Sequence, residues 1–177
     1  MAKPLLALLG LFILIAGGCG KKMSEEQLFT AAQQFEAKED MDGALKIYEE
    51  MSARFPNSPH ADSVLQKLGM IYLNKKAQFD KAVATYERLV EKFPQSKYLP
   101  QSMFMIGYIY ANHIKDFDKA KASYDQFIAQ YPQHELAASV QWELEHLGKD
   151  ISEIDIFDKA STADGKTNGA TESRAKP

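Results

Sequence analysis

Residues 65–94 read LQKLGMIYLNKKAQFDKAVATYERLVEKFP, and residues 103–132 repeat their pattern 38 positions later as MFMIGYIYANHIKDFDKAKASYDQFIAQYP. In both copies, apolar residues recur every three or four positions, which indicates two amphipathic helices in each unit. A repeat of this length is typical of arrays of helix pairs, in which each pair buries its apolar face against the next. The sequence therefore predicts an all-α array, and such an array favours a binding surface over a reaction centre.

Glycine recurs in phase with the helices. Gly69 and Gly107 are expected inside the first helix of each unit, where glycine costs about 1 kcal/mol relative to alanine. A cost that is repeated at the same position suggests that the second helix approaches closely there. Ala82 and Ala120 are the small residues expected to meet the two glycines.

The second helix of each unit is expected to end at a proline, which lacks a backbone donor. Phe-Pro pairs occur at 55–56 and 93–94, and a Tyr-Pro pair occurs at 131–132. Ser58 and Ser96 each follow two residues after a proline, where they are expected to cap the next helix.

The order of Leu, Gly, Tyr, Ala, aromatic residue and Pro in these units resembles the tetratricopeptide repeat. The resemblance extends over about residues 24–147, with Ala31 in place of glycine in a weaker first unit and a half-unit from about Glu135 to Leu147. It implies a short right-handed solenoid of antiparallel helix pairs, with about three 38-residue repeats and a capping helix. The long unit ending in Phe-Pro-x-Ser is also similar to envelope lipoproteins of Gram-negative bacteria. The similar kinds are the outer-membrane assembly lipoprotein BamD and the Tol–Pal-associated periplasmic repeat protein.

The N-terminus has the features of a processing signal. Lys3 provides a positive charge, residues 5–15 are almost wholly apolar, and small residues precede Cys19. This pattern resembles a bacterial lipoprotein signal, which implies that residues 1–18 are removed and that Cys19 carries diacylglycerol and an acyl chain such as palmitate. Cys19 is the only cysteine, so it has no disulfide partner within the chain. In lipoproteins of this kind, a glycine at position 20 favours the periplasmic face of the outer membrane.

Composition divides the rest of the chain into three parts. We expect a lipidated tether over residues 19–23, a tetratricopeptide-like helical domain over residues 24–160 and a disordered tail over residues 161–177. The tail contains no large apolar side chain, so nothing in it offsets the entropy cost of ordering.

Charge and motifs argue against several other functions. The net charge is −3 and lysine is interspersed with glutamate, which disfavours a nucleic-acid partner. His134-Glu135 lacks the second histidine of a zinc protease, because residue 138 is alanine. The sequence contains no phosphate-binding glycine loop and no nucleophile elbow. We therefore expect no catalytic residue, no metal, no cofactor and no small-molecule substrate.

In tetratricopeptide proteins the first helix of each unit lines an inner groove, and the resemblance implies this position for eight residues. They include amides and apolar groups, which together could bind the backbone and the side chains of an extended or helical peptide. These predicted groove residues are Gln66, Met70, Leu73, Asn74, Phe104, Tyr108, Asn112 and Trp142.

Together these features predict a lipid-anchored scaffold for protein–protein interactions in the cell envelope, and not an enzyme. Its groove would bind an envelope protein or a peptide segment, and the lipid on Cys19 would bind the membrane. Two narrower interpretations stay open. One is a BamD-like component of outer-membrane β-barrel assembly, and the other is a factor linked to Tol–Pal or to peptidoglycan.

Overall fold

The computed structural model describes residues 22–149, and this part of the chain is helical with no β-strand. Its elements are α1 (Glu25–Ala37), α2 (Met41–Arg54), α3 (Ala61–Asn74), α4 (Phe79–Lys92), α5 (Leu99–Ile109), η1 (Tyr110–Ile114), α6 (Phe117–Gln130) and α7 (Ala137–Glu145). Consecutive helices pack against each other, and η1 is a turn of π-helix that continues α5. The expected all-α, tetratricopeptide-like solenoid of helix pairs is confirmed.

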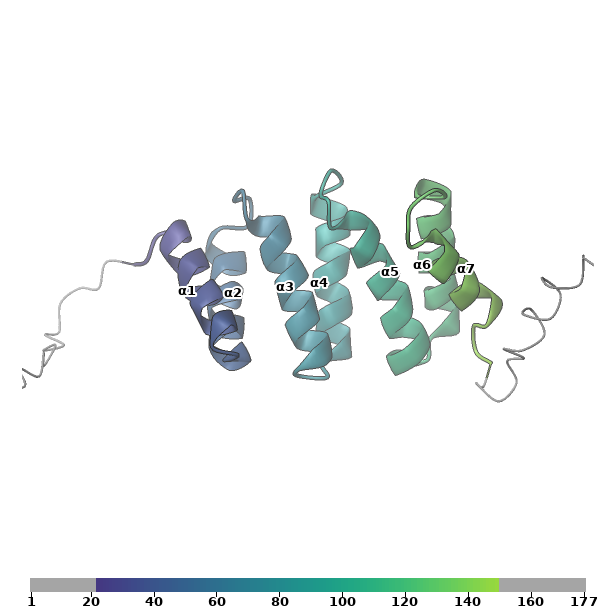
Figure 1. The fold of residues 1–177 in the computed structure, drawn as a ribbon, viewed down its shortest axis with the longest axis horizontal. Helices are drawn as coiled ribbons and strands as arrows, with labels where there is room; N and C mark the ends of the chain where they lie inside the picture. Colours follow the sequence, from purple (N-terminus) through teal and green to yellow (C-terminus); the bar gives the residue numbers. More distant parts are fainter. Residues whose placement is uncertain (1–21, 150–177) are drawn as a thin grey trace, which may run out of the picture.

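The helices form two layers. The first helix of each unit (α1, α3, α5 and α7) lies in the nearer layer of Figure 1, and α2, α4 and α6 lie behind. The core between the layers is periodic, because Tyr48, Tyr86 and Tyr124 are all buried and stand 38 residues apart on the second helices. Each repeat thus contributes one large ring to the core between the layers, with Tyr48 and Tyr86 in one apolar cluster and Tyr124 in a second.

The glycines mark the closest approach between paired helices. A Cβ built on Gly69 would lie 2.5 Å from the ring of Tyr86, and one on Gly107 would lie 2.4 Å from the ring of Tyr124. The expected close approach is therefore confirmed, and the nearest atoms to each glycine belong to a tyrosine ring one turn after the alanine. The contact with Ala82 and Ala120 stays a prediction.

The turn inside each helix pair also repeats. Glu39, Ala77 and Lys115 have φ angles of 58°, 47° and 64°, in the left-handed region that L-residues rarely adopt. The residue after each of them is the N-cap of the second helix. Two of these N-caps, Asp40 and Asp116, are aspartates whose side chains cap the helix. Asp40 Oδ1 accepts a hydrogen bond from the Gly43 N–H at 2.8 Å, and Asp116 caps α6 in the same way.

The serines after the prolines do not cap the next helix, so that prediction is wrong. Helices α3 and α5 begin after His60 and Tyr98, and neither has a side-chain cap. Ser58 Oγ instead accepts from the His60 N–H at 3.3 Å, and Ser96 Oγ accepts from the Tyr98 N–H at 3.1 Å. Each serine lies two residues before the N-cap residue and closes a short turn there, so its hydroxyl is not placed to accept from the first turn of the helix.

Successive repeats are linked on the side of the second helices. The hydroxyl of Tyr72 on α3 donates to Glu49 Oε1 of the preceding unit at 2.6 Å, and Lys81 Nζ lies 5.4 Å from the centre of the same ring. One repeat later, Lys119 Nζ lies 5.2 Å from the ring of Tyr110. The contact between lysine and ring thus recurs within both units, whereas the bond from Tyr72 to Glu49 joins one unit to the unit before it.

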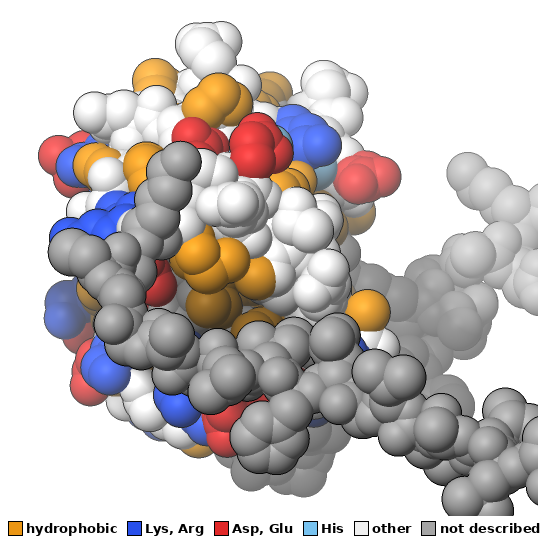
Figure 2. All heavy atoms as spheres, turned by 90° about the vertical axis from the view of Figure 1, so that its left-hand side faces the viewer, with side chains coloured by type: hydrophobic (Ala, Val, Ile, Leu, Met, Phe, Trp, Pro, Cys, Tyr) orange, Lys and Arg blue, Asp and Glu red, His pale blue; other side chains and the backbone are white. Residues whose placement is uncertain are grey.

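Helix α1 forms the N-terminal end of the row, which faces the viewer in Figure 2. Hydrophobic side chains gather near the middle of this face, next to uncharged polar ones. A hollow of about 400 Å³ on this helix is lined by Met23, Glu26, Gln27, Thr30, Ala31 and Gln34. No other helix among residues 22–149 covers this hollow.

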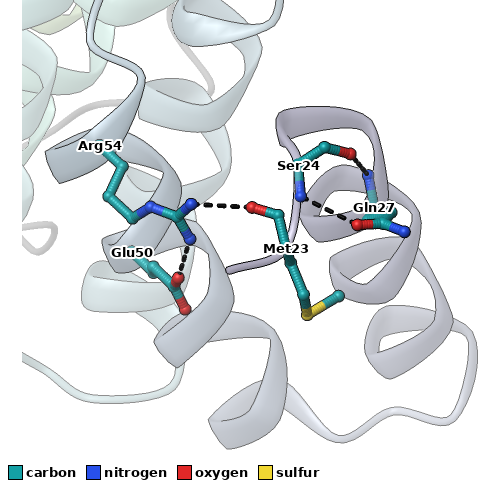
Figure 3. Close-up of polar contacts among 5 residues, drawn as sticks. All are labelled: Met23, Ser24, Gln27, Glu50 and Arg54. Atoms are coloured by element: carbon teal, nitrogen blue, oxygen red, sulfur yellow. Dashed lines mark hydrogen bonds and ion pairs between the residues drawn. The ribbon is translucent and has the colours of Figure 1, made fainter. Parts of the chain in front are cut away.

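The start of α1 is held by two sets of hydrogen bonds (Figure 3). The Ser24 N–H donates to Gln27 Oε1 at 2.9 Å, and the Gln27 N–H donates to Ser24 Oγ at 3.3 Å, which is a capping box. Arg54 of α2 donates to the carbonyl oxygen of Met23 at 2.8 Å and forms an ion pair with Glu50. The last residue of the predicted tether, Met23, is therefore hydrogen-bonded to the second helix.

Candidate protein-binding surface

The layer of first helices carries the exposed apolar side chains among the predicted groove residues. Met70 on α3 and Trp142 on α7 have exposed fractions of 42% and 48%, which are high for such large apolar groups. Phe104 and Tyr108 on α5 are half-buried, with their ring centres 6.1 Å apart. We call these four residues the apolar strip.

Two predicted groove residues are not accessible at the surface. Gln66 is 4% exposed and Leu73 is 8% exposed. The amide of Gln66 accepts from Ser102 Oγ at 3.1 Å and donates to Gln101 Oε1 at 3.1 Å, so it joins α3 to α5. Leu73 packs in the core. Both side chains point between helices, where a partner cannot reach them without opening the fold.

Four of the remaining six predicted groove residues fall into two separate clefts instead of one. Met70 and the exposed Asn74 line a cleft of about 130 Å³ with Met41 and Lys67. The exposed Asn112 lies at the other end of the row, in a cleft that Trp142 also lines. Phe104 and Tyr108 of the apolar strip line neither of these two clefts.

The cleft at the C-terminal end, which we call the α7 cleft, has a volume of about 390 Å³. Its walls come from η1, from the start of α6 and from α7. They are lined by Ala111, Asn112, Lys115, Phe117, Trp142, Glu143, His146, Leu147, Gly148 and Lys149. Burial raises the pKa of the Glu143 carboxyl above its usual value. The ring of Trp142 stacks on His146, with ring centres 4.4 Å apart.

A larger hollow of about 610 Å³ lies between α1, α3 and the loop before α5, and the sequence analysis missed it. Its wall includes His60, whose ring stacks on Phe29 with centres 4.0 Å apart and whose Nε2 lies 3.3 Å from Glu26 Oε1. Asp62 accepts a hydrogen bond from Ser96 at 2.6 Å on the opposite side. The residues that line this hollow come from different elements, so the pattern within any single helix does not point to them.

The described residues offer neither a metal centre nor a membrane span. Over residues 22–149 no group of three or more His, Cys, Asp or Glu side chains is placed to hold a metal ion. Within the same range no helix is both long enough and apolar enough to cross a bilayer. Cys19, the predicted lipidation site, lies outside the described residues.

Comparison with known families gives one result that bears on function. A family model described as "YfiO: Outer membrane lipoprotein" matches residues 21–107 and, again, residues 73–144. The two matches overlap, as expected of a chain whose units repeat, and together they span the whole helical row. No curated protein matches the chain.

Proposed function

Because the chain belongs to the YfiO family of outer membrane lipoproteins, we propose that it is a lipid-anchored scaffold that binds other envelope proteins through its layer of first helices. The observation that carries this proposal is the apolar strip. Met70 and Trp142 expose large apolar surface on the same layer as the half-buried Phe104 and Tyr108. Exposed groups of this kind, set among polar side chains, are typical of protein interfaces, where aromatic anchors carry much of the binding energy.

The family supports an outer-membrane location, and we propose Cys19 as the point of attachment. Residues 1–18 would be the signal peptide, residues 19–23 the tether and residues 161–177 a disordered tail. Ser24 follows five positions after Cys19, a reach of about 18 Å at most. Because Arg54 fastens Met23 to α2, such a short tether would hold the N-terminal end of the row close to the membrane and point the later repeats into the periplasm.

The anchor is tested by Cys19→Ser. The variant should move from the membrane fraction to the soluble periplasmic fraction, because the thioether bond to diacylglycerol requires the thiol. Cys19→Ala should behave in the same way, and wild-type protein labelled with palmitate serves as the reference. If both variants stay in the membrane fraction, residues 1–18 hold the protein by themselves and the lipoprotein assignment is wrong.

Within this function, a BamD-like part in outer-membrane β-barrel assembly is the partner assignment that the family favours. The full lipidated chain should then co-purify with the barrel-assembly subunits from detergent-solubilised envelopes. Co-purification with Tol–Pal proteins or with peptidoglycan instead would favour the second interpretation, the Tol–Pal or peptidoglycan-linked factor.

The binding surface is tested in the same experiment with two double variants. Met70→Ala with Tyr108→Ala removes two groups of the apolar strip and should weaken co-purification at least tenfold, since the truncation of an interface anchor costs about 2 kcal/mol. Lys121→Ala with Gln130→Ala changes two exposed residues of α6 and should leave co-purification unchanged. Loss of binding in the α6 variant alone would place the partner on the layer of second helices. Circular dichroism checks that both variants keep their helices.

A further inference from the structure

We propose that residues 150–160 of this same chain dock into the α7 cleft and complete the last repeat. This proposal does not rest on the proposed function, because it concerns how the helical row ends. The segment reads DISEIDIFDKA and follows directly on Lys149, which itself lines the cleft.

The first argument is an aromatic ring that is covered in one repeat and uncovered in the next. Phe79, at the start of α4, stacks on His113 with ring centres 4.3 Å apart. Phe117 holds the same position at the start of α6, 38 residues later, but it is 40% exposed. The residue 38 positions after His113 is Ile151. The repeat therefore provides an apolar side chain for Phe117 just beyond the described part of the chain.

The second argument is where the chain runs. A Cβ built on Gly148 would lie 3.6 Å from the ring of Phe117, so the backbone passes beside this ring as it leaves α7. Gly148 has a φ of +77°, in the left-handed region that favours glycine. Helix α7 has already ended at Glu145, and this conformation turns the chain next to the cleft three residues later. From Lys149, eight more residues reach Phe157, a span of up to about 27 Å, so distance does not prevent docking.

The third argument is a sequence motif. Helices α4 and α6 both begin with Phe-Asp-Lys-Ala, at 79–82 and 117–120, and the same four residues occur at 157–160. In both earlier units this motif starts the helix that packs on the preceding first helix. The third copy indicates the start of a second helix for α7, whose Trp142 is still 48% exposed.

The fourth argument is charge. The segment carries four acidic residues, at 150, 153, 155 and 158, and one lysine. The cleft presents Lys115, Lys149 and His146 against the single carboxylate of Glu143. Three isoleucines and Phe157 supply the apolar surface for Phe117 and Trp142, and the acidic residues face a mainly basic rim.

Docking has a consequence for binding. Asn112 and Trp142, two predicted groove residues, line the α7 cleft, so the segment would cover them. A partner would then contact the part of the apolar strip formed by Met70, Phe104 and Tyr108.

The test uses Trp142, which is the only tryptophan in the chain, so that its fluorescence reports on the cleft alone. In the full chain, Ile154→Asp with Phe157→Asp should shift the emission to longer wavelength and increase quenching by iodide. Thr162→Asp with Thr167→Asp adds the same charge outside the segment and should leave the emission wavelength and the quenching unchanged. Adding a synthetic peptide of residues 150–160 to the first variant should restore the original emission.

Identical emission from wild type and both variants would overturn the proposal. So would wild-type emission that depends on protein concentration, because a second copy of the chain would then be covering the cleft. Lys115→Glu gives a second measurement, since it changes the rim and not the segment. It should increase quenching by acrylamide, a neutral quencher that the new negative charge does not repel, and unchanged quenching in that variant would argue against the charge pairing.

Discussion

At Gly69 and Gly107 a missing side chain lets a tyrosine ring lie against the backbone of the facing helix. The rings of Tyr86 and Tyr124 lie so near that a Cβ on either glycine would overlap them. Both rings are buried, so neither can swing into solvent to make room. Glycine inside the helix is unfavourable by itself, but it leaves the space in which each of these two repeats buries a large aromatic ring.

The substitution Gly107→Leu tests this contact. We expect a loss of about 1–3 kcal/mol in the free energy of unfolding from overpacking, which exceeds the gain of about 1 kcal/mol in helix propensity. Thermal denaturation followed by circular dichroism measures the difference. Ala122→Leu on the exposed side of α6 is the matched control and should change the melting temperature little. A Gly107→Leu protein that melts at or above the wild-type temperature would show that the contact is not tight.

At the scale of single elements, the tight turn inside each helix pair is the most regular feature. Glu39, Ala77 and Lys115 all adopt left-handed backbone conformations, although none is glycine. This conformation costs an L-residue roughly 1–2 kcal/mol. The repeat keeps the geometry because it sets the angle at which the second helix folds back on the first.

Replacing Ala77 by glycine should stabilise the protein. The substitution removes the left-handed penalty of roughly 1–2 kcal/mol. It also stabilises the unfolded state by about 0.4–1 kcal/mol, because glycine gives that state more conformational entropy. We therefore expect a small net increase in the free energy of unfolding. Ala84→Gly makes the same change in the middle of α4 and should cost about 1 kcal/mol. Urea denaturation of the two variants gives both values. A lower midpoint for Ala77→Gly than for wild type would contradict the role assigned to this turn.

For the whole molecule, buried tyrosines form a series that runs through the repeats. Burial raises the pKa of Tyr48, Tyr72, Tyr86 and Tyr124 above the usual value of 10.0. A group whose pKa is higher in the folded state stabilises the fold fully below its unfolded pKa, and this contribution is lost as the pH rises above that value.

The free energy of unfolding should therefore be steady up to about pH 10 and fall steeply above it. Tyr86→Phe should reduce the slope above pH 10 by about 1.4 kcal/mol per pH unit, since one buried ionising group is removed. The Tyr86 hydroxyl has no hydrogen-bond partner among the described residues, so the variant should be no less stable than wild type at pH 7. Urea denaturation at pH 7, 9, 10 and 11 measures both effects. Equal slopes for variant and wild type would mean that Tyr86 does not control the alkaline transition.

Local signals predicted several features of this fold, and they missed others for identifiable reasons. The 38-residue period and the positions of glycine predicted the helix pairs and their closest contact. Aspartate before a helix is a known capping signal, and Asp40 and Asp116 could have been identified by it. No such signal exists for the bond from Arg54 to Met23, because the two residues share neither a helix nor a repeat position.

The sequence by itself determined the all-α class, the length of the repeat and the family of outer membrane lipoproteins, because all of these are periodic or local patterns. Only the tertiary structure decided which residues of the first helices remain at the surface. Gln66 and Leu73 have the same helical spacing as the exposed Met70, yet they are buried. The reason is that burial of one helix depends on the helix of the next repeat. That helix lies more than 30 residues away in the sequence. The angle at which it packs cannot be predicted from the spacing of apolar residues within one helix.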